Sequence, residues 1–172
     1  MKIEFRSGLY NTLCIALGYA VGAQLGFLLA PLAHWSVTLL WPPSGVALAA
    51  VLLAGRSTLP GIFLGAFVTN LSQLPFPITP LILCIGLAIS AASTLSALAA
   101  GAMLKRIAPR APRALSGAEL LKGYIATGLA CTIAASGGIG SLYLSGLVPA
   151  EEVGVTWGLW WLGDYCGMLI FG

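Results

Sequence analysis

The sequence predicts an all-α protein that crosses a membrane several times, as a polytopic helix bundle. Hydrophobic residues make up 59% of the 172-residue chain, charged residues make up only 8%, and the mean hydropathy is +0.98. A soluble globular domain carries about 25% charged residues, so this chain has too few of them to cover a surface in water. The length suits one integral-membrane domain, residues 1–172, without a soluble domain beside the bundle.

Apolar runs, bounded by charges or by clusters of Pro and Gly, divide the chain into about six predicted transmembrane helices. A helix that crosses the hydrocarbon core needs about 20 residues. The first run follows the charged start Lys2–Arg6 but exceeds the roughly 7–15 apolar residues of a signal-peptide core, so we expect an uncleaved first helix. The predicted helices are Leu9–Ala33, Trp35–Ala54, Leu59–Leu74, Leu81–Leu104, Leu120–Leu147 and Thr156–Gly172.

The distribution of Lys and Arg predicts the orientation of these helices. Positive residues concentrate in the short cytoplasmic loops of membrane proteins. The predicted outer connections, around His34, Pro75–Pro80 and Val148–Val155, contain no Lys or Arg and hold the pair Glu151–Glu152. We therefore expect both termini in the cytoplasm. The inner segments then hold all eight basic residues: Lys2, Arg6, Arg56, Lys105, Arg106, Arg110, Arg113 and Lys122.

The second predicted helix contains Trp41-Pro42-Pro43-Ser44-Gly45, and we expect this pentapeptide to break it. Two consecutive prolines remove two backbone donors and disfavour helical geometry at the preceding residue. Lipid cannot satisfy the freed carbonyl groups, so such a break is tolerated where protein or a water-filled cavity surrounds it. The pentapeptide is therefore the first candidate for a site.

Glycines at a spacing of four predict close packing between helices, because small residues four apart leave a flat face that another backbone can approach. The segment Ser136–Ser141 lacks the third glycine of a dinucleotide-binding fingerprint and follows no predicted strand. It marks either a close helix crossing or a helix that loosens beside a cavity. The glycines expected at helix contacts are Gly18, Gly22, Gly26, Gly61, Gly65, Gly137, Gly138 and Gly140.

Polar side chains inside the predicted helices converge on one layer in the outer half of the bundle. At a rise of about 1.5 Å per residue, Gln24, Ser44, Gly140 and Asp164 each lie about 10–14 Å from the outer end of their helix, with Asn70 shallower. A carboxylate at the bilayer centre costs roughly 2.5–3.5 kcal/mol, and no basic residue lies in a predicted span to pair with Asp164.

This layer predicts a ligand pocket with aromatic walls and a few polar groups, which is typical of small-molecule sites. The alternative is a structural hydrogen-bond network, with the tryptophans as interfacial anchors. Trp157 and Tyr165 are further candidates for the wall. The predicted ligand-binding residues are Gln24, Trp41, Pro42, Pro43, Ser44, Asn70, Trp160, Trp161 and Asp164.

The sequence gives no support for catalysis, for a cofactor or for nucleic-acid binding. The single histidine, His34, lacks companion metal ligands, so no metal site is expected. No Ser-His-Asp or Cys-His arrangement and no paired carboxylates occur within the predicted spans, so we expect a protein that is not an enzyme. The four cysteines lie in apolar runs without CxxC spacing, as packing residues: Cys14, Cys84, Cys131 and Cys166.

Two motifs resemble the first family of bacterial membrane-associated sensor domains, MASE type one. Trp41–Gly45, followed by Pro60–Phe67 and Asn70, resembles one signature, and Trp160–Asp164 matches the other. The resemblance covers about Leu9–Gly172. The matching motif positions are Trp41, Pro42, Pro43, Ser44, Gly45, Gly61, Gly65, Asn70, Trp161, Gly163 and Asp164.

The resemblance implies a sensory input module of the bacterial inner membrane. It would relay the signal of an unidentified small ligand to a cytoplasmic signalling domain, either a histidine kinase of a two-component system or an enzyme of cyclic-di-GMP signalling. Members of the family generally continue into further helices and an output domain, whereas this chain ends at Gly172. We therefore expect a standalone or truncated sensor, or one that signals through a separate protein, and a homodimer is compatible with the sequence.

Two other classes of function remain open from the residues alone. A broken helix beside a pocket in the outer half of the bundle also suits the membrane substrate-binding subunit of a vitamin-type uptake transporter. A structural membrane protein without any ligand is the third hypothesis. In all three cases the lipid bilayer is the surrounding medium.

Overall fold

The computed structural model describes residues 8–28, 38–109 and 115–172, and no strand occurs in them. The predicted all-α class is therefore confirmed. Two short 3-10 helices, η2 (Gly55–Thr58) and η3 (Ala150–Glu152), precede α3 and α6. The α-helices are α1 (Gly8–Leu28), α2 (Pro42–Ala54), α3 (Leu59–Leu71), α4 (Pro80–Ile107), α5 (Gly117–Leu144) and α6 (Val153–Phe171).

Within the described residues, four helical segments are long and apolar enough to cross a membrane, so the predicted count of six is not confirmed. The helices α2 and α3 have 13 residues each, about 20 Å, which is shorter than the hydrocarbon core of about 30 Å. They count as one segment by length and composition only, because helical residues continue through η2. The four segments are Gly8–Leu28, Pro42–Leu71, Pro80–Ile107 and Gly117–Leu144.

The double proline begins a helix rather than breaking one, which corrects the expected break at Trp41–Gly45. Trp41 is the N-cap residue of α2, with φ −116° and ψ 83°, and the two prolines occupy the first helical turn. The first N–H groups of any helix lack intrahelical acceptors, so prolines lose no hydrogen bond there. Thr38, Leu39 and Leu40 are not helical, and residues 29–37 lie outside the described part of the chain.

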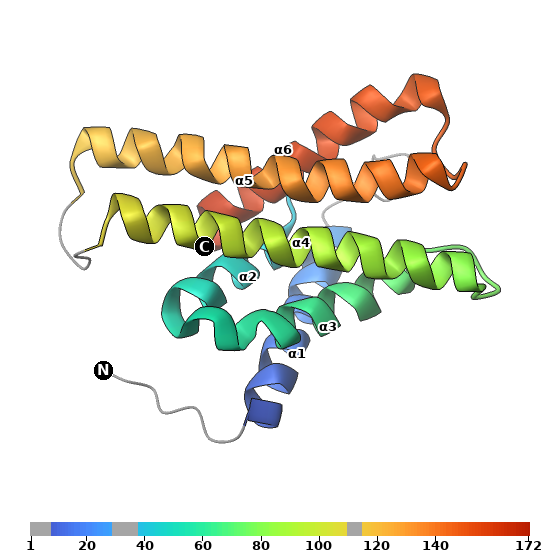
Figure 1. Ribbon diagram of the computed structural model, residues 1–172, viewed down its shortest axis with the longest axis horizontal. Coiled ribbons are helices and arrows are strands. Elements are labelled where there is room, and N and C mark those ends of the chain that lie inside the picture. The colour runs from blue at the N-terminus through green and yellow to red at the C-terminus, as the bar shows by residue number, and fades with distance from the viewer. Residues whose placement is uncertain (1–7, 29–37, 110–114) are drawn as a thin grey trace.

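Figure 1 shows the chain turning back at η2, so that α3 runs in the opposite direction to α2. Gly55 begins the turn with a φ of 72°, a backbone conformation that favours glycine. The side chain of Lys105, on α4, reaches this turn, and its Nζ donates a hydrogen bond to the carbonyl oxygen of Val51 at 2.8 Å. The turn is therefore fixed both by its own backbone and by α4.

The long helices α4 and α5 lie side by side, and the shorter helices pack around them (Figure 1). Both α2 and α4 contribute to two buried clusters, so these two helices form the centre of the fold. The first cluster joins α1, α2, α3 and α4 through residues that include Tyr19, Ala47, Ile62 and Ala97. The second joins α2, α4, α5 and α6 through Leu48, Ala100, Ala130, Cys131 and Met168.

Glycines set the closest helix crossings. A Cβ at Gly61 would lie 2.7 Å from the carbonyl oxygen of Thr12, and one at Gly65 would lie 2.7 Å from the Cβ of Tyr19, where α3 crosses α1. On α5, a Cβ at Gly137 would overlap Ala92 of α4. Two of the predicted packing glycines differ: Gly18 has only an ordinary contact with Val46, and Gly140 has no neighbour within 4 Å.

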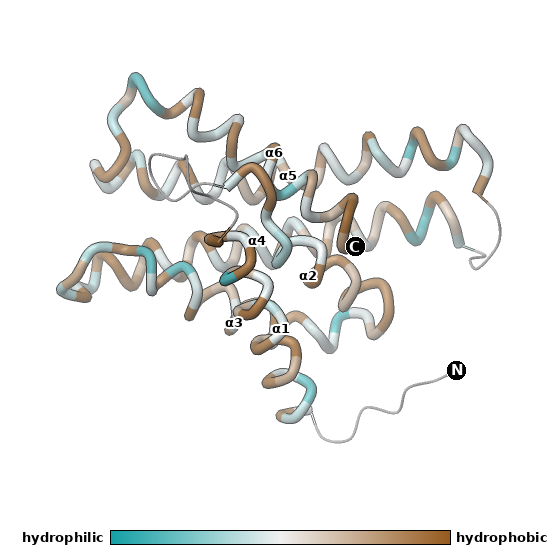
Figure 2. The backbone as a smooth tube through the Cα atoms, turned by 180° about the vertical axis from the view of Figure 1, so that it is seen from behind, coloured by the Kyte–Doolittle hydropathy of each residue, from teal (hydrophilic) through white to brown (hydrophobic). Residues whose placement is uncertain are grey.

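Large apolar side chains remain exposed on the outer faces of the helices, as expected of a multi-pass membrane protein. Leu17, Leu53, Leu95, Leu129 and Leu144 are each at least half exposed. Figure 2 shows hydrophobic stretches along every helix rather than in one patch. Such a surface is unfavourable in water and suits contact with lipid.

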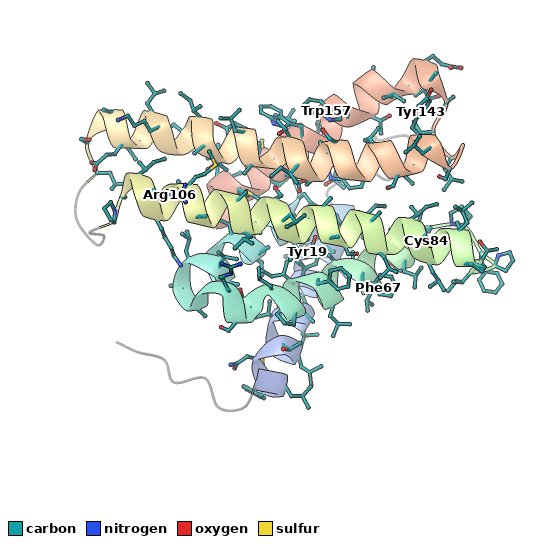
Figure 3. The ribbon with its side chains drawn as sticks, in the orientation of Figure 1. Tyr19, Phe67, Cys84, Arg106, Tyr143 and Trp157 are labelled. Carbon is teal, nitrogen blue, oxygen red and sulfur yellow. The ribbon has the colours of Figure 1, made fainter. Side chains whose placement is uncertain are left out.

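Apart from the buried Asp164, the charged residues that the structure describes lie toward the two ends of the molecule. Arg56, Lys105, Arg106 and Lys122 are located in η2, the last turn of α4 and the second turn of α5, which meet at one end. Figure 3 shows Arg106 at this end, and Cys84 and Tyr143 toward the other. The second end carries the α3–α4 connection and η3, which contains Glu151 and Glu152.

Candidate functional site

The start of α2 and the middle of α6 pack backbone against backbone. The N–H of Trp41 donates to the carbonyl oxygen of Gly163 at 3.0 Å. The Ser44 hydroxyl lies 2.8 Å from the carbonyl oxygen of Trp41 and 2.9 Å from that of Asp164, 120 residues away in sequence. We call this contact the α2–α6 junction: Thr38, Trp41, Ser44, Gly163, Asp164 and Gly167.

Two glycines of α6 make the junction possible. A Cβ at Gly163 would overlap the carbonyl oxygen of Thr38, and one at Gly167 would overlap the carbonyl oxygen of Trp41. On the opposite side of α2, a Cβ at Gly26 of α1 would lie 2.9 Å from the Trp41 ring. The segment that leads into α2 is thus held between two helices that lack side chains at the contact points.

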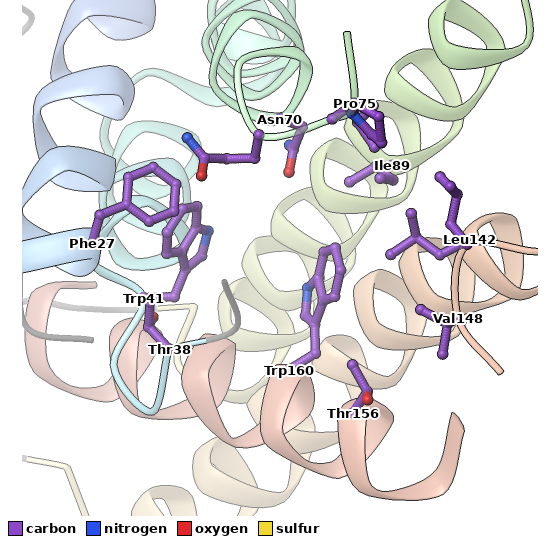
Figure 4. Close-up of a pocket in the computed structure, with 13 residues that line it drawn as sticks. Phe27, Thr38, Trp41, Asn70, Pro75, Ile89, Leu142, Val148, Thr156 and Trp160 are labelled. Carbon is purple, nitrogen blue, oxygen red and sulfur yellow. The ribbon is translucent and has the colours of Figure 1, made fainter. Parts of the chain in front are cut away.

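A cavity of about 240 Å³ lies beside this junction. Figure 4 shows Trp41 and Phe27 on one side of it and Trp160 across from them, with Asn70 between the two sides. None of the thirteen described residues that line it is charged. They are Phe27, Thr38, Trp41, Asn70, Gln73, Leu74, Pro75, Ile89, Leu142, Leu147, Val148, Thr156 and Trp160.

This cavity, the larger of two among the described residues, lies in the half of the molecule away from the basic residues. Its lining includes Gln73, Leu74 and Pro75 from the α3–α4 connection, and Leu147 and Val148 from the α5–α6 connection. Both connections are located at the end opposite to η2 (Figure 1). Under the predicted orientation, this is the extracytoplasmic half.

A second, much smaller cavity of about 10 Å³ contains Asp164. The Asp164 side chain is 4% exposed, and its Oδ2 atom has no hydrogen-bond partner. Tyr19 and Ser93 also line this cavity and lie close to each other, and the Trp160 indole lies beside the Asp164 carboxyl group. Trp160 therefore lines the larger cavity and lies beside a residue of the smaller one.

The structure brings most of the predicted ligand-binding residues to the two cavities, although it divides them. Trp41, Asn70 and Trp160 line the larger cavity, whereas Ser44 and Asp164 line the smaller one. In place of the single pocket expected from helix depth, the structure has a larger aromatic cavity and a smaller polar one.

The remaining predicted residues line neither cavity. Pro42 and Pro43 are buried at the start of α2, where a Cβ at Gly22 would approach the backbone nitrogen of Pro43 to 3.4 Å. Gln24 is exposed on α1. The indole of Trp161 faces α5, where its Nε1 donates to the carbonyl oxygen of Gly128 at 2.8 Å.

Two further wall candidates and one predicted packing glycine also have defined positions. Tyr165 stacks on Trp161, with ring centroids 5.1 Å apart, and Trp157 donates a hydrogen bond from Nε1 to the Ser136 hydroxyl at 3.1 Å. A Cβ at Gly138 would lie 2.8 Å from the Trp160 ring, so this glycine makes room for the cavity wall.

Sequence reasoning missed Tyr19, which has the largest fully buried side chain among the described residues and lines the smaller cavity. A signal for it existed. Tyr19 precedes Gly22 by three residues and Gly26 by seven, so it lies on the same helix face as the glycine ridge that was predicted to pack. Phe27, one residue after Gly26, lines the larger cavity and packs against Trp41 in a tilted arrangement, with ring centroids 5.2 Å apart.

The chemistry offered by these residues is that of binding. The larger cavity presents aromatic rings, two side-chain amides and two threonine hydroxyls. Within the described residues, no group of three His, Cys, Asp or Glu side chains is placed to hold a metal ion. The described cysteines are free thiols.

The comparisons with known proteins give one match. The model of the MASE1 family matches residues 12–172, which include both the Trp41–Gly45 and the Trp160–Asp164 motifs. No curated protein and no solved structure matches the chain.

Proposed function

Because the chain belongs to the MASE1 family of membrane-associated sensor domains, we propose that it detects a small uncharged ligand in the larger cavity and relays this signal across the inner membrane. Its family and its apolar helices make it a multi-pass membrane protein. The output we propose is a cytoplasmic histidine kinase or cyclic-di-GMP enzyme, in the same full-length protein or in a separate one.

The observation that carries this proposal is the composition of the larger cavity. Its aromatic walls, Phe27, Trp41 and Trp160, offer flat apolar surfaces, and Asn70 and Thr156 offer a few hydrogen-bonding groups. The described lining residues offer no counter-charge to a charged ligand, and burial of a charge without one is unfavourable. The ligand class that fits best is therefore a neutral, partly aromatic or aliphatic molecule with one or two polar groups.

The relay follows from the elements that hold the walls. Trp41 is fixed at the start of α2 and Trp160 on α6, so a ligand that touches both rings contacts both sides of the α2–α6 junction. A ligand shifts an equilibrium only if it binds one arrangement more tightly than the other. We propose that it favours one packing of the junction, and that α6 carries the change to Phe171 near the basic end.

The test is thermal unfolding of the purified chain in detergent with a panel of uncharged aromatic molecules, phenol-sized to indole-sized. At least one should raise the unfolding temperature saturably. The Trp160→Ala variant should bind this molecule with a Kd at least about tenfold higher, which corresponds to about 1.4 kcal/mol. Trp157→Ala is the matched control, because Trp157 lies one turn away on α6 and does not line the cavity.

The relay is measured in the same samples with a fluorescent label on Ile170→Cys, in a background without the native cysteines. Ile170 is exposed in the last turn of α6. The emission of its label should change with the same ligand. The ligand concentration at the midpoint of this change should equal that at the midpoint of the rise in unfolding temperature. If no panel member distinguishes the wild type from Trp160→Ala, the cavity is not the ligand site.

A further inference from the structure

In the part of the chain that the structure describes, the buried carboxylate of Asp164 has no positively charged partner, although the Trp160 indole lies beside it. It is 4% exposed, and its Oδ2 accepts no hydrogen bond. Among the described residues, Lys and Arg lie only in η2, near the end of α4 and near the start of α5, and none forms an ion pair with it. An isolated buried carboxylate is strongly unfavourable unless a cation or several donors compensate it.

The small cavity beside Asp164 offers oxygen atoms from four helices. The side chains that carry them are Tyr19 of α1, Ser44 of α2, Ser93 and Ser96 of α4, and Asp164 of α6. The other residues that line the cavity are apolar. The cavity thus has the composition of a site for a hard cation, which prefers oxygen ligands.

Two of the serine hydroxyl groups already donate their hydrogen to backbone carbonyl oxygens. The Ser44 hydroxyl points to the carbonyl oxygens of Trp41 and Asp164, and the Ser96 hydroxyl donates to that of Ala130 at 2.8 Å. A serine hydroxyl has one hydrogen, so these side chains can present only lone pairs to the cavity. An occupant between them and the Asp164 carboxylate therefore has to be positively charged or a hydrogen-bond donor.

We propose that this cavity binds one Na⁺ ion against Asp164, with the neighbouring hydroxyl groups as further oxygen ligands. A single positive charge neutralises the single carboxylate, whereas a divalent ion would leave an uncompensated charge in a poorly polarisable interior. The volume of about 10 Å³ admits one water-sized sphere, so it can hold one bare ion but not a hydrated one. The few side-chain oxygens around it suit Na⁺ better than K⁺, which takes more oxygen ligands.

The position of this ion gives it a structural consequence. It would join α1, α2, α4 and α6 at the centre of the bundle and would stabilise their packing. Because the Trp160 indole lies beside Asp164 and also lines the larger cavity, occupancy of the two cavities would be linked reciprocally. The ion site itself does not depend on a ligand in the larger cavity.

The test is the unfolding temperature of the full chain, purified without sodium and titrated with NaCl against choline chloride at constant total salt and fixed pH. The wild type should gain stability saturably with Na⁺, and KCl should give a clearly smaller gain. The unfolding temperature should rise with Na⁺ concentration as it does for any ligand that binds only the folded state. A gain of equal size with KCl or choline chloride would overturn the proposal.

Two variants assign the effect to the cavity. Asp164→Asn removes the charge at nearly constant size and should abolish the Na⁺ response, while its stability without sodium should equal or exceed that of the wild type. Glu151→Gln, an exposed carboxylate of η3, is the matched control and should keep the full response. A response that persists in Asp164→Asn would show that the ion binds elsewhere.

A third variant covers the case in which Asp164→Asn fails to fold. Ser93→Ala removes one oxygen from the cavity wall and should raise the Na⁺ midpoint by at least about tenfold, or about 1.4 kcal/mol. An unchanged midpoint in Ser93→Ala, or a wild type whose stability does not respond to Na⁺, would indicate a cavity that holds only water or a proton and would refute the proposal.

Discussion

At the scale of single residues, two glycines of α6 determine how closely this helix approaches the chain at the start of α2. The Trp41 N–H reaches the carbonyl oxygen of Gly163 only because neither Gly163 nor Gly167 has a side chain in the way. Trp41 in turn positions one wall of the larger cavity. A methyl group at either glycine would therefore disturb packing and site together.

We predict that Gly163→Ala destabilises the protein by about 1–3 kcal/mol, the usual cost of forcing an extra methyl group into a packed contact. The new Cβ would overlap the carbonyl oxygen of Thr38 and push α6 away from the junction. The measurement is denaturant or thermal unfolding in detergent. Gly158→Ala on the same helix is the control, because no atom lies within 4 Å of its Cβ position. This control should be neutral or slightly stabilising, since Ala favours helix over Gly by up to about 1 kcal/mol. Equal losses of stability in both variants would mean that overlap with Thr38 at the junction does not cause the destabilisation of Gly163→Ala.

Sequence reasoning at this scale identified the residue types correctly but not their distribution. Depth along each helix put Ser44 and Asp164 in one layer, with Asn70 shallower, and the structure places all three beside a cavity. Depth carries no information on the direction in which a side chain points, and so Gln24, at the same depth, is exposed. Direction depends on how a helix is rotated about its axis. Only the helix contacts fix that rotation.

At the scale of elements, the double proline shows where a sequence-based prediction fails for a physical reason. An apolar run has no internal mark for the point at which a helix begins, so Trp35–Ala54 was predicted as one span. Proline is compatible both with a kink and with a first turn, and the structure uses the second option at Pro42 and Pro43. The short α2 that results can turn back at Gly55, a reversal that the hydropathy profile alone does not reveal.

We predict that Lys105→Met weakens this turn and destabilises the protein by about 0.5–1 kcal/mol. The Lys105 ammonium group donates to the carbonyl oxygen of Val51, which also accepts the N–H of Gly55, so it caps the last turn of α2. A positive charge at a helix C-terminus is favourable, although exposure of the lysine to solvent reduces the effect.

The control for the α2 turn is Arg106→Met, which removes the same charge from the next residue of α4, another exposed position. Unfolding in detergent should show a larger loss for Lys105→Met than for Arg106→Met. If the two variants lose the same stability, the effect belongs to net charge and not to the hydrogen bond at Val51.

At the scale of the whole molecule, charge and cavity are separated along its length. The described basic residues lie at one end, whereas the acidic pair of η3 and most of the lining of the larger cavity lie toward the other. The positive-inside rule needs only the order of charges along the chain, and for this reason orientation could be predicted without a structure. The cavity could not be predicted from the order of charges, because it is formed by contacts between distant segments.

We predict that Glu151→Cys reacts with a membrane-impermeant thiol reagent in intact cells, whereas Ser57→Cys reacts only after the membrane is permeabilised. Both positions are exposed, in η3 and η2 respectively, and they belong to opposite ends of the molecule. Each substitution is made in a background that lacks the four native cysteines, so that every label reports one site. Labelling of Ser57→Cys in denatured samples controls for expression. The reverse pattern would place Arg56 outside and the larger cavity toward the cytoplasm, and the ligand would then have to be sought among cytoplasmic molecules.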